Sequence, residues 1–353
     1  MPREPEPFPG LFSQRLFRFI KVPSLHPTIT AHSSSRDRNR ADDLMKAGRF
    51  AEAVPIYRRL VQISPEEDSH LLALAWALHD SGESDEAVAC FERLFRKELA
   101  RGLFTGFAYD ELVRIYRERK NGKALISVCE RAAAAQPEDV GILQTLGESY
   151  LSTGMAAEAS GVFEKLTERE PDAPGHWCSL GDVRLAEGDP GRAETAYNRA
   201  MEIDPAATAV FLNRLAEGLL RSGFPEWAAK AWEKSLKACP DEPLAWSGIG
   251  DCLLCLGKPD AAAEAYGRAA ELRPVSAAAF WNRLGRGLSR KGFHSRAAEA
   301  FIKAVAAEPG NPLHALRLAQ SYAADGRNGL AAEALRRAEA RKSFPADHGG
   351  NRS

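Results

Sequence analysis

Glycine and proline recur along this chain at a nearly constant interval, and this period restricts the fold more than any other feature. Successive landmark glycines are 34, 72, 34, 35, 34, 35 and 34 residues apart, so the doubled interval hides one degenerate unit. A proline follows 17 residues after the glycine in each unit that keeps both landmarks. Such a period is typical of repeat proteins whose units stack on their neighbours. The glycines are Gly48, Gly82, Gly154, Gly188, Gly223, Gly257, Gly292 and Gly326, and the prolines are Pro65, Pro137, Pro171, Pro205, Pro240, Pro274 and Pro309.

Between these landmarks the same residue types return at the same positions. In three units an aromatic residue, a leucine or isoleucine and a glycine precede the turn, and two alanines flank a second aromatic residue after it. This pattern resembles the tetratricopeptide repeat signature, W-x2-L-G-x2-Y followed by A-x3-F and P. The matching residues are Trp177, Leu180, Gly181, Ala193, Tyr197 and Ala200; Trp246, Ile249, Gly250, Ala262, Tyr266 and Ala269; and Trp281, Leu284, Gly285, Ala297, Phe301 and Ala304.

Each position of the signature has a physical reason. The first segment reads as an amphipathic helix that ends at the turn glycine, and the second as a helix that ends before the proline. One unit cannot bury both of its apolar faces, so neighbouring units must stack. We therefore expect an all-α fold, an α-solenoid of antiparallel helix pairs. The resemblance implies a right-handed superhelix whose concave wall is formed by the first helix of each pair.

We predict about nine repeats in a single array over residues 34–341. Between the second and third units the spacing lengthens by four residues around Leu99 to Phe107, and Lys120 stands where the turn glycine is expected. We expect a local change of superhelical angle at this join. The approximate units are 34–67, 68–105, 106–139, 140–173, 174–208, 209–242, 243–277, 278–311 and 312–341.

Two segments flank the predicted array. Residues 1–33 are rich in proline and serine, which indicates a flexible arm, and residues 342–353 read as a disordered tail. Inside the arm, the stretch LFSQRLFRFIKV places apolar residues on one side of a helix and basic residues largely opposite. Three alternatives stay open for this stretch: a disordered arm, a segment that docks on a groove of this protein or a partner, and a segment that touches lipid.

The overall composition argues against several classes of partner. The chain of 353 residues carries 47 basic and 48 acidic side chains, a balance that does not favour nucleic acid. No apolar run approaches the roughly 18 residues of a membrane-spanning helix, so we expect no integral membrane contact. Six cysteines are scattered along a long chain, which favours a reducing, cytoplasmic compartment.

The sequence offers little for catalysis or cofactors. It lacks the phosphate-binding, nucleophile-elbow and dinucleotide-binding glycine motifs. Cys252 and Cys255 form a C-x2-C pair, but a second ligand pair is absent nearby, and cysteine is an ordinary small packing residue. His70, His79, His176, His294 and His314 are expected to share no repeat position and no ligand spacing. We predict no enzyme activity, no metal and no cofactor.

The resemblance places the partner-binding groove on first-helix residues that flank the Leu-Gly pair. Glu148, Asp182, Glu217 and Asp251 each follow the signature glycine or alanine in four consecutive repeats. This acidic row either favours a basic segment in the partner or is simply a solvated polar face. The next repeat is basic instead, so the groove is polarised along its length. The candidate groove residues are Gln144, Glu148, Cys178, Asp182, Asn213, Arg214, Glu217, Arg221, Ser247, Asp251, Asn282, Arg283, Arg286 and Arg290.

The leading functional hypothesis is a non-enzymatic scaffold or adaptor that binds a partner protein or peptide in the groove and supports assembly of a multiprotein complex. Two alternatives stay open. One is a structural scaffold in which copies of the chain associate with each other. The other is a regulatory repeat subunit of an enzyme supplied in trans, because enzymes of this family carry a separate catalytic domain and the repeats fill nearly all of this sequence.

Overall fold

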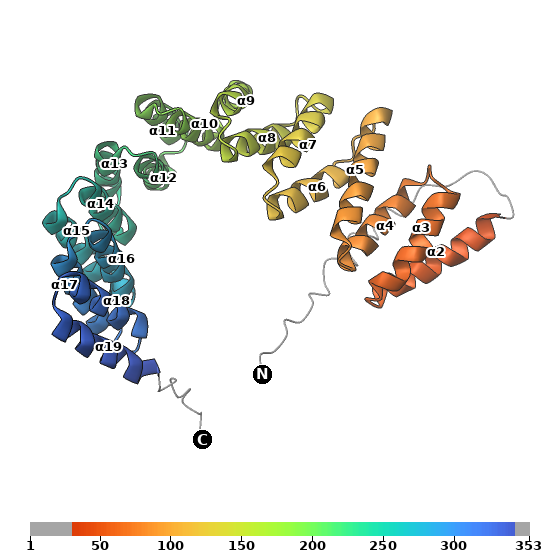
Figure 1. Ribbon diagram of the computed structural model, residues 1–353. Helices are drawn as coiled ribbons and strands as arrows, with labels where there is room; N and C mark the ends of the chain where they lie inside the picture. The colour runs from red at the N-terminus through yellow and green to blue at the C-terminus, as the bar shows by residue number, and fades with distance from the viewer. Residues whose placement is uncertain (1–29, 343–353) are drawn as a thin grey trace, which may run out of the picture. The chain divides into compact units, whose positions relative to one another are not determined.

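Helices in antiparallel pairs make up the structure, a computed structural model that describes residues 30–342 (Figure 1). The first helices are α2 (Thr30–Lys46), α4 (Asp68–Asp80), α6 (Phe107–Glu118), α8 (Val140–Ser152), α10 (Pro174–Ala186), α12 (Thr208–Arg221), α14 (Pro243–Cys255), α16 (Ala277–Arg290) and α18 (Pro312–Ala324). The second helices are α3 (Phe50–Ile63), α5 (Ser84–Arg101), α7 (Gly122–Ala135), α9 (Ala156–Arg169), α11 (Pro190–Ile203), α13 (Pro225–Ala238), α15 (Pro259–Leu272), α17 (His294–Ala307) and α19 (Asn328–Lys342). The pairs confirm the predicted all-α solenoid.

The contacts of the chain group into two compact units. The boundary falls inside α8, between Ser149 and Tyr150. The first unit therefore holds α2 to α7 and most of α8, and the second holds α9 to α19. The expected amphipathic stretch of the N-terminal arm and the tail from residue 343 lie outside the described residues.

The turns between paired helices explain the glycine period. Every landmark glycine has a positive φ, from 71° to 90°, which costs glycine little because it has no Cβ. Lys120 occupies the same place between α6 and α7 with a φ of 52°, so the prediction that it replaces the turn glycine is confirmed. A side chain in this left-handed region costs about 1 to 2 kcal/mol relative to helical φ.

The second signature glycine serves packing rather than turning. A Cβ at Gly250 would lie 2.5 Å from Cδ2 of Tyr266, and one at Gly285 would lie 2.7 Å from Cε1 of Phe301. The aromatic ring of the second helix therefore rests directly on the backbone of the first helix. Tyr266 is fully buried. The signature aromatic residue therefore serves packing and does not form a solvent-facing site.

The longer spacing between the second and third repeats is taken up by one extended helix. α5 has 18 residues, whereas most second helices have 14, and Gly102 ends it in the left-handed conformation. Phe104 in the following loop packs edge-on against Phe95 and at a tilt against Tyr109, at ring-centroid distances of 6.1 and 5.9 Å. The irregular join is thus filled by aromatic packing.

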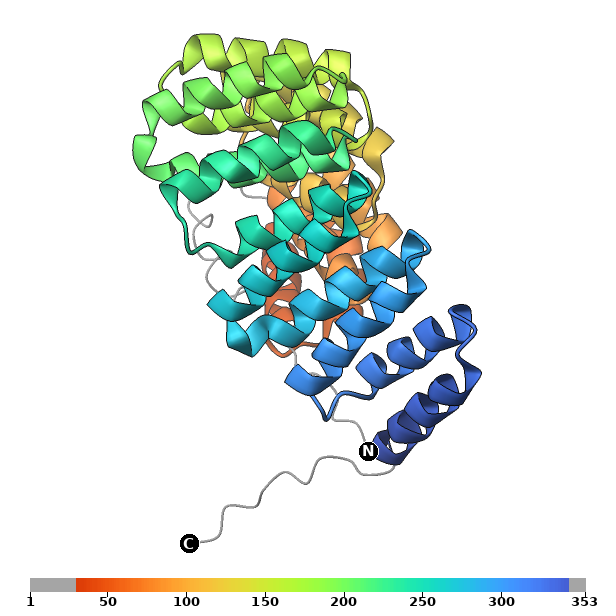
Figure 2. The same cartoon turned by 90° about the vertical axis from the view of Figure 1, so that its left-hand side faces the viewer.

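In the second unit the first helices line the inner side of a curve. Contacts between successive first helices from α10 to α16 are more extensive than contacts between successive second helices. Figure 1 shows α12, α16 and α18 on the inner side, and Figure 2 shows the same helices stacked as successive layers. The exposed face of the first helices is therefore the concave face of this unit.

Candidate functional site

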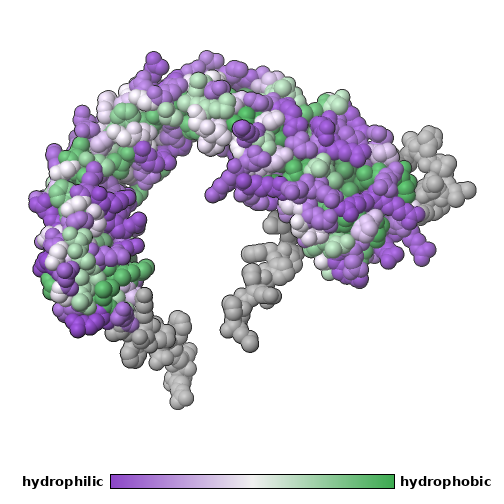
Figure 3. Space-filling view, in the orientation of Figure 1, coloured by the Kyte–Doolittle hydropathy of each residue, from purple (hydrophilic) through white to green (hydrophobic). Residues whose placement is uncertain are grey.

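The concave face of the second unit consists of first-helix residues spaced at helical intervals. On α12 the exposed set is Val210, Arg214, Glu217 and Arg221, spaced by four, three and four residues. Residues with this spacing share one side of a helix. α16 repeats the arrangement with Ala279, Arg283, Arg286 and Arg290, all exposed. Figure 3 shows hydrophilic residues gathered along the inner edge of this unit.

Three predicted groove residues are not accessible, and that part of the prediction is wrong. Cys178 is 1% exposed, Ser247 0% and Asn282 8%, because their position faces the neighbouring repeat and not solvent. Asn213 at the same position is half-buried and accepts a hydrogen bond of 2.6 Å from the hydroxyl of Ser235. Gln144 is exposed on α8 in the first unit and donates to Glu148 at 3.1 Å.

The predicted acidic row is mostly neutralised by the chain itself. Glu148 accepts a hydrogen bond from Arg117 at 3.2 Å within the first unit. Asp182 and Asp251 in the second unit pair with arginines of the following repeat, while exposed Glu217 forms no ion pair within the described residues. A partner with a basic segment would therefore compete with arginines that already hold these carboxylates.

Asp182 joins two consecutive repeats through both of its oxygens. The hydroxyl of Tyr197 on α11 donates to Oδ1 at 2.6 Å. Arg214 on α12 donates to Oδ2 from Nη2 at 2.6 Å and from Nε at 3.1 Å. The carboxylate therefore satisfies a buried tyrosine of its own repeat and fixes an arginine of the next. Burial beside this carboxylate raises the pKa of Tyr197 above its usual value.

Asp251 repeats this arrangement two repeats later. Tyr266 on α15 donates to Oδ1 at 2.5 Å, and Arg283 on α16 donates to Oδ2. The tyrosine again follows the aspartate by 15 residues and the arginine by 32. In both cases the aspartate directly follows the signature glycine, and the arginine directly precedes the next signature leucine. The structure thus assigns these aspartates to joints between repeats.

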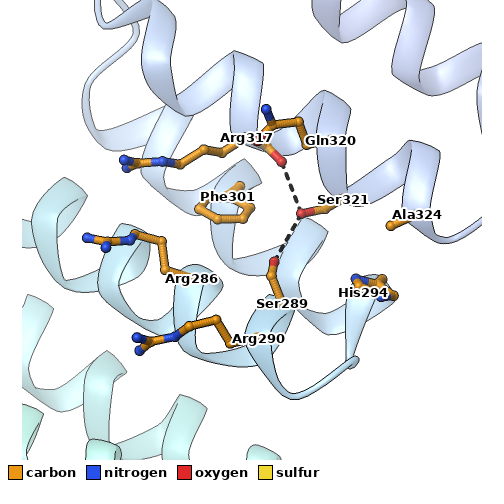
Figure 4. Close-up of a pocket in the computed structure, with 9 residues that line it drawn as sticks. All are labelled: Arg286, Ser289, Arg290, His294, Phe301, Arg317, Gln320, Ser321 and Ala324. Atoms are coloured by element: carbon orange, nitrogen blue, oxygen red, sulfur yellow. Dashed lines mark hydrogen bonds between the residues drawn. The ribbon is translucent and has the colours of Figure 1, made fainter.

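A cavity of about 350 Å³ opens on the concave face between α16, α17 and α18. Arg286 and Arg290 of α16 and Arg317 of α18 line it, with Phe301, Ser289 and Ser321. Figure 4 shows the three guanidinium groups on one side of the cavity, with the ring of Phe301 between Arg286 and Arg317. Within residues 30–342, none of the three arginines has a carboxylate partner. We call this cavity the cationic pocket.

Arg317 is held in place from behind by a buried network. Its guanidinium donates to Oδ1 of Asn282, so the amide nitrogen of Asn282 faces Nδ1 of His314 at 2.6 Å. His314 accepts there and donates from Nε2 to Glu308 at 2.9 Å. This hydrogen bond lowers the pKa of Glu308. Arg317 is therefore oriented before any ligand arrives, although its charge stays uncompensated.

Arg317 and the exposed apolar residues of the face were missed from the sequence. Arg317 precedes Leu318 as Arg214 precedes Leu215 and Arg283 precedes Leu284, and this register could have identified it. Val210, Leu244 and Leu313 are 66%, 41% and 52% exposed near the starts of α12, α14 and α18. They add an apolar edge to the concave face.

Three of the five histidines do share a repeat position, so the sequence prediction is wrong for these three. His70, His176 and His314 are each the third residue of a first helix, and all three are buried. His176 contacts Glu170 at 2.9 Å as His314 contacts Glu308, so each joins its helix to the preceding loop. His314 in addition contacts Asn282 of the preceding repeat.

The C-x2-C pair is split between core and surface. Cys252 is buried, which raises the pKa of its thiol to about 12, and Cys255 is exposed. No cluster of three or more His, Cys, Asp or Glu side chains suited to a metal occurs within the described part of the chain. Over the same residues, no helix combines the length and apolarity needed to cross a bilayer.

Comparison with known proteins agrees with the repeat architecture. The human Protein O-mannosyl-transferase TMTC1 is 24% identical over 164 residues, which are 45% of this chain and 18% of the relative. The Protein CTR9 homolog of Arabidopsis thaliana is 26% identical over 157 residues, 41% of this chain and 14% of the relative. The chain thus matches less than a fifth of either relative.

Among solved structures, a tetratricopeptide repeat protein from Parabacteroides merdae aligns with a TM-score of 0.50. It is 16% identical, and the alignment covers 72% of this chain and 99% of that one. Sequence profiles described as tetratricopeptide repeat match residues 44–99, 145–208, 213–279 and 282–347, which together exceed half of the chain. With its helix pairs, glycine turns and ring-on-glycine packing, the chain belongs to the tetratricopeptide repeat family.

Proposed function

We propose that this protein is a non-enzymatic scaffold that binds a partner peptide or protein along the concave face of the second unit and so supports assembly of a multiprotein complex. The observation that carries this proposal is the concave face itself. It exposes four-residue sets of charged and apolar side chains on α12 and α16, while the signature residues are used in packing. Such a face offers an extended partner many contacts on a rigid support.

The absence of enzyme activity is part of the same proposal. On this face Asp182 and Asp251 are held in joints between repeats, and exposed Glu217 forms no ion pair within the described residues. A general base or nucleophile needs a partner within hydrogen-bond reach. We also place the protein in the cytoplasm, which the six free cysteines support, since scattered thiols persist in reducing compartments.

The test is affinity purification of the tagged full chain from its native cells, beside the variant Leu244→Glu/Leu313→Glu. Both side chains are exposed on the concave face, so the fold tolerates the change while a docked partner is displaced. Val275→Glu is the matched control, because Val275 is 95% exposed in the short connection before α16. We expect the double variant to lose partners that the control retains. Equal recovery from both variants would contradict the proposal.

The same protein samples test the two alternative functions, self-association and a regulatory subunit of an enzyme. Light scattering of the purified chain at several concentrations tests self-association, because a scaffold built from copies of this chain grows with concentration. An enzyme activity that co-purifies with the wild type and is lost with the double variant would instead favour a regulatory subunit of that enzyme.

A further inference from the structure

The register of the concave face identifies a joint that lacks its own acid. At two joints of the second unit, an aspartate after the signature glycine binds the tyrosine of its repeat and the arginine of the next. The residues in the same three positions at the joint between α16, α17 and α18 are Arg286, Phe301 and Arg317. The carboxylate is replaced by a cation, the hydroxyl is lost, and the arginine of the following repeat remains.

The cationic pocket lies at this joint. Arg286 and Arg317 both line it and are joined by Arg290, so three guanidinium groups surround a place where other joints hold a carboxylate. Like charges gathered in a partly enclosed space repel one another, and the repulsion is relieved when an anion enters. Asn282 keeps Arg317 directed at the pocket at the same time. The pocket is therefore preorganised for a group of opposite charge.

We propose that an acidic segment of a partner protein places an Asp or Glu carboxylate in the pocket of Arg286, Arg290 and Arg317, where it completes the joint as Asp182 and Asp251 complete theirs. A guanidinium group binds a carboxylate through two parallel hydrogen bonds, as Arg214 already binds Asp182. This inference rests on the proposed function, since it names the chemistry of the partner that the concave face takes.

The test uses fluorescence anisotropy of the full chain with three labelled decapeptides, of glutamate, glutamine and lysine, in low salt. The glutamate peptide should bind and the other two should not, and added salt should weaken binding because the contact is ionic. The decisive variant is Arg286→Asp, which supplies the missing acid from within. We expect it to weaken binding of the glutamate peptide at least about tenfold, because its carboxylate occupies Arg317.

Arg192→Asp is the matched control, with the same change of charge on second helix α11, where Arg192 is 70% exposed. It should leave binding within about twofold of wild type. Thermal unfolding gives a second readout: the melting temperature of Arg286→Asp should equal or exceed that of the wild type, because an aspartate at this position is native to two other joints. A lower melting temperature would show that the position does not accept a carboxylate.

Several outcomes would overturn the inference. One is that the Arg286→Asp variant binds the glutamate peptide as tightly as the wild type does. A second is that the wild type does not bind the glutamate peptide at about 1 mM. A third is that a phosphorylated peptide of equal charge binds far more tightly than the glutamate peptide. The last result would assign the pocket to phosphate. Failure of this inference remains distinct from failure of the proposed function. If Leu244→Glu/Leu313→Glu loses a partner that Arg286→Asp retains, the concave face binds the partner and the cationic pocket does not.

Discussion

The change Asp251→Ala tests whether the aspartates of the concave face hold repeats together. It removes the acceptor of Tyr266, whose side chain is fully buried and cannot turn to water. An unsatisfied buried hydroxyl costs about 1 to 3 kcal/mol. The ion pair with Arg283 adds only about 0 to 1 kcal/mol, since the arginine side chain is 52% exposed. We expect a loss of about 2 kcal/mol of unfolding free energy.

The assay is equilibrium urea unfolding of the full chain, followed by circular dichroism, in a double-mutant cycle with Tyr266→Phe. The tyrosine variant alone should cost about 1 kcal/mol, because Asp251 keeps Arg283 as a partner. The double variant should lose about 1 kcal/mol less unfolding free energy than the sum of the losses of the two single variants. Asp260→Ala is the control, because Asp260 is 76% exposed in its pair with Arg296 and should change little. Additive costs, or an Asp251→Ala effect no larger than the control, would refute this role.

Three further expectations can be checked by the same unfolding assay. Gly285→Val should cost about 1 to 3 kcal/mol, since its Cβ would clash with the ring of Phe301, and an unchanged midpoint would mean that the helices can separate. Lys120→Gly should stabilise the fold by about 0.5 to 1 kcal/mol through relief of its positive φ, and a loss of stability would contradict this reading. Burial raises the pKa of Tyr197 and Tyr266 above the unfolded value of about 10, so the folded state holds these protons more tightly. The contribution of these two tyrosines to the free energy of unfolding is complete below about pH 10 and declines as the pH rises further. A Tyr197→Phe/Tyr266→Phe variant should lose less stability than the wild type between about pH 9 and pH 11, and an equal decline would refute the assignment.

Much of the candidate site could be read from the period, although its chemistry could not. First-helix positions on either side of the Leu-Gly pair were assigned to the groove, and Arg214, Glu217, Arg283, Arg286 and Arg290 are indeed exposed there. Cys178, Ser247 and Asn282 were assigned to the same face but are buried, because a helix in a stacked array is covered on two sides. A helical wheel marks which residues share a side, but it does not show how far the next repeat reaches over them.

The sequence by itself determined the helix pairs, the turns and the ring-on-glycine packing. These depend on residues within one repeat, where a left-handed glycine or an absent Cβ has a local steric cause. Only the tertiary structure decided which charged side chains are neutralised by ion pairs within the protein. Asp182 and Asp251 meet arginines 32 residues away because consecutive first helices lie side by side, and Arg286 and Arg317 meet at a joint without an acid for the same reason. Whether a charged side chain of one repeat is paired depends on the residues that the neighbouring repeat places beside it.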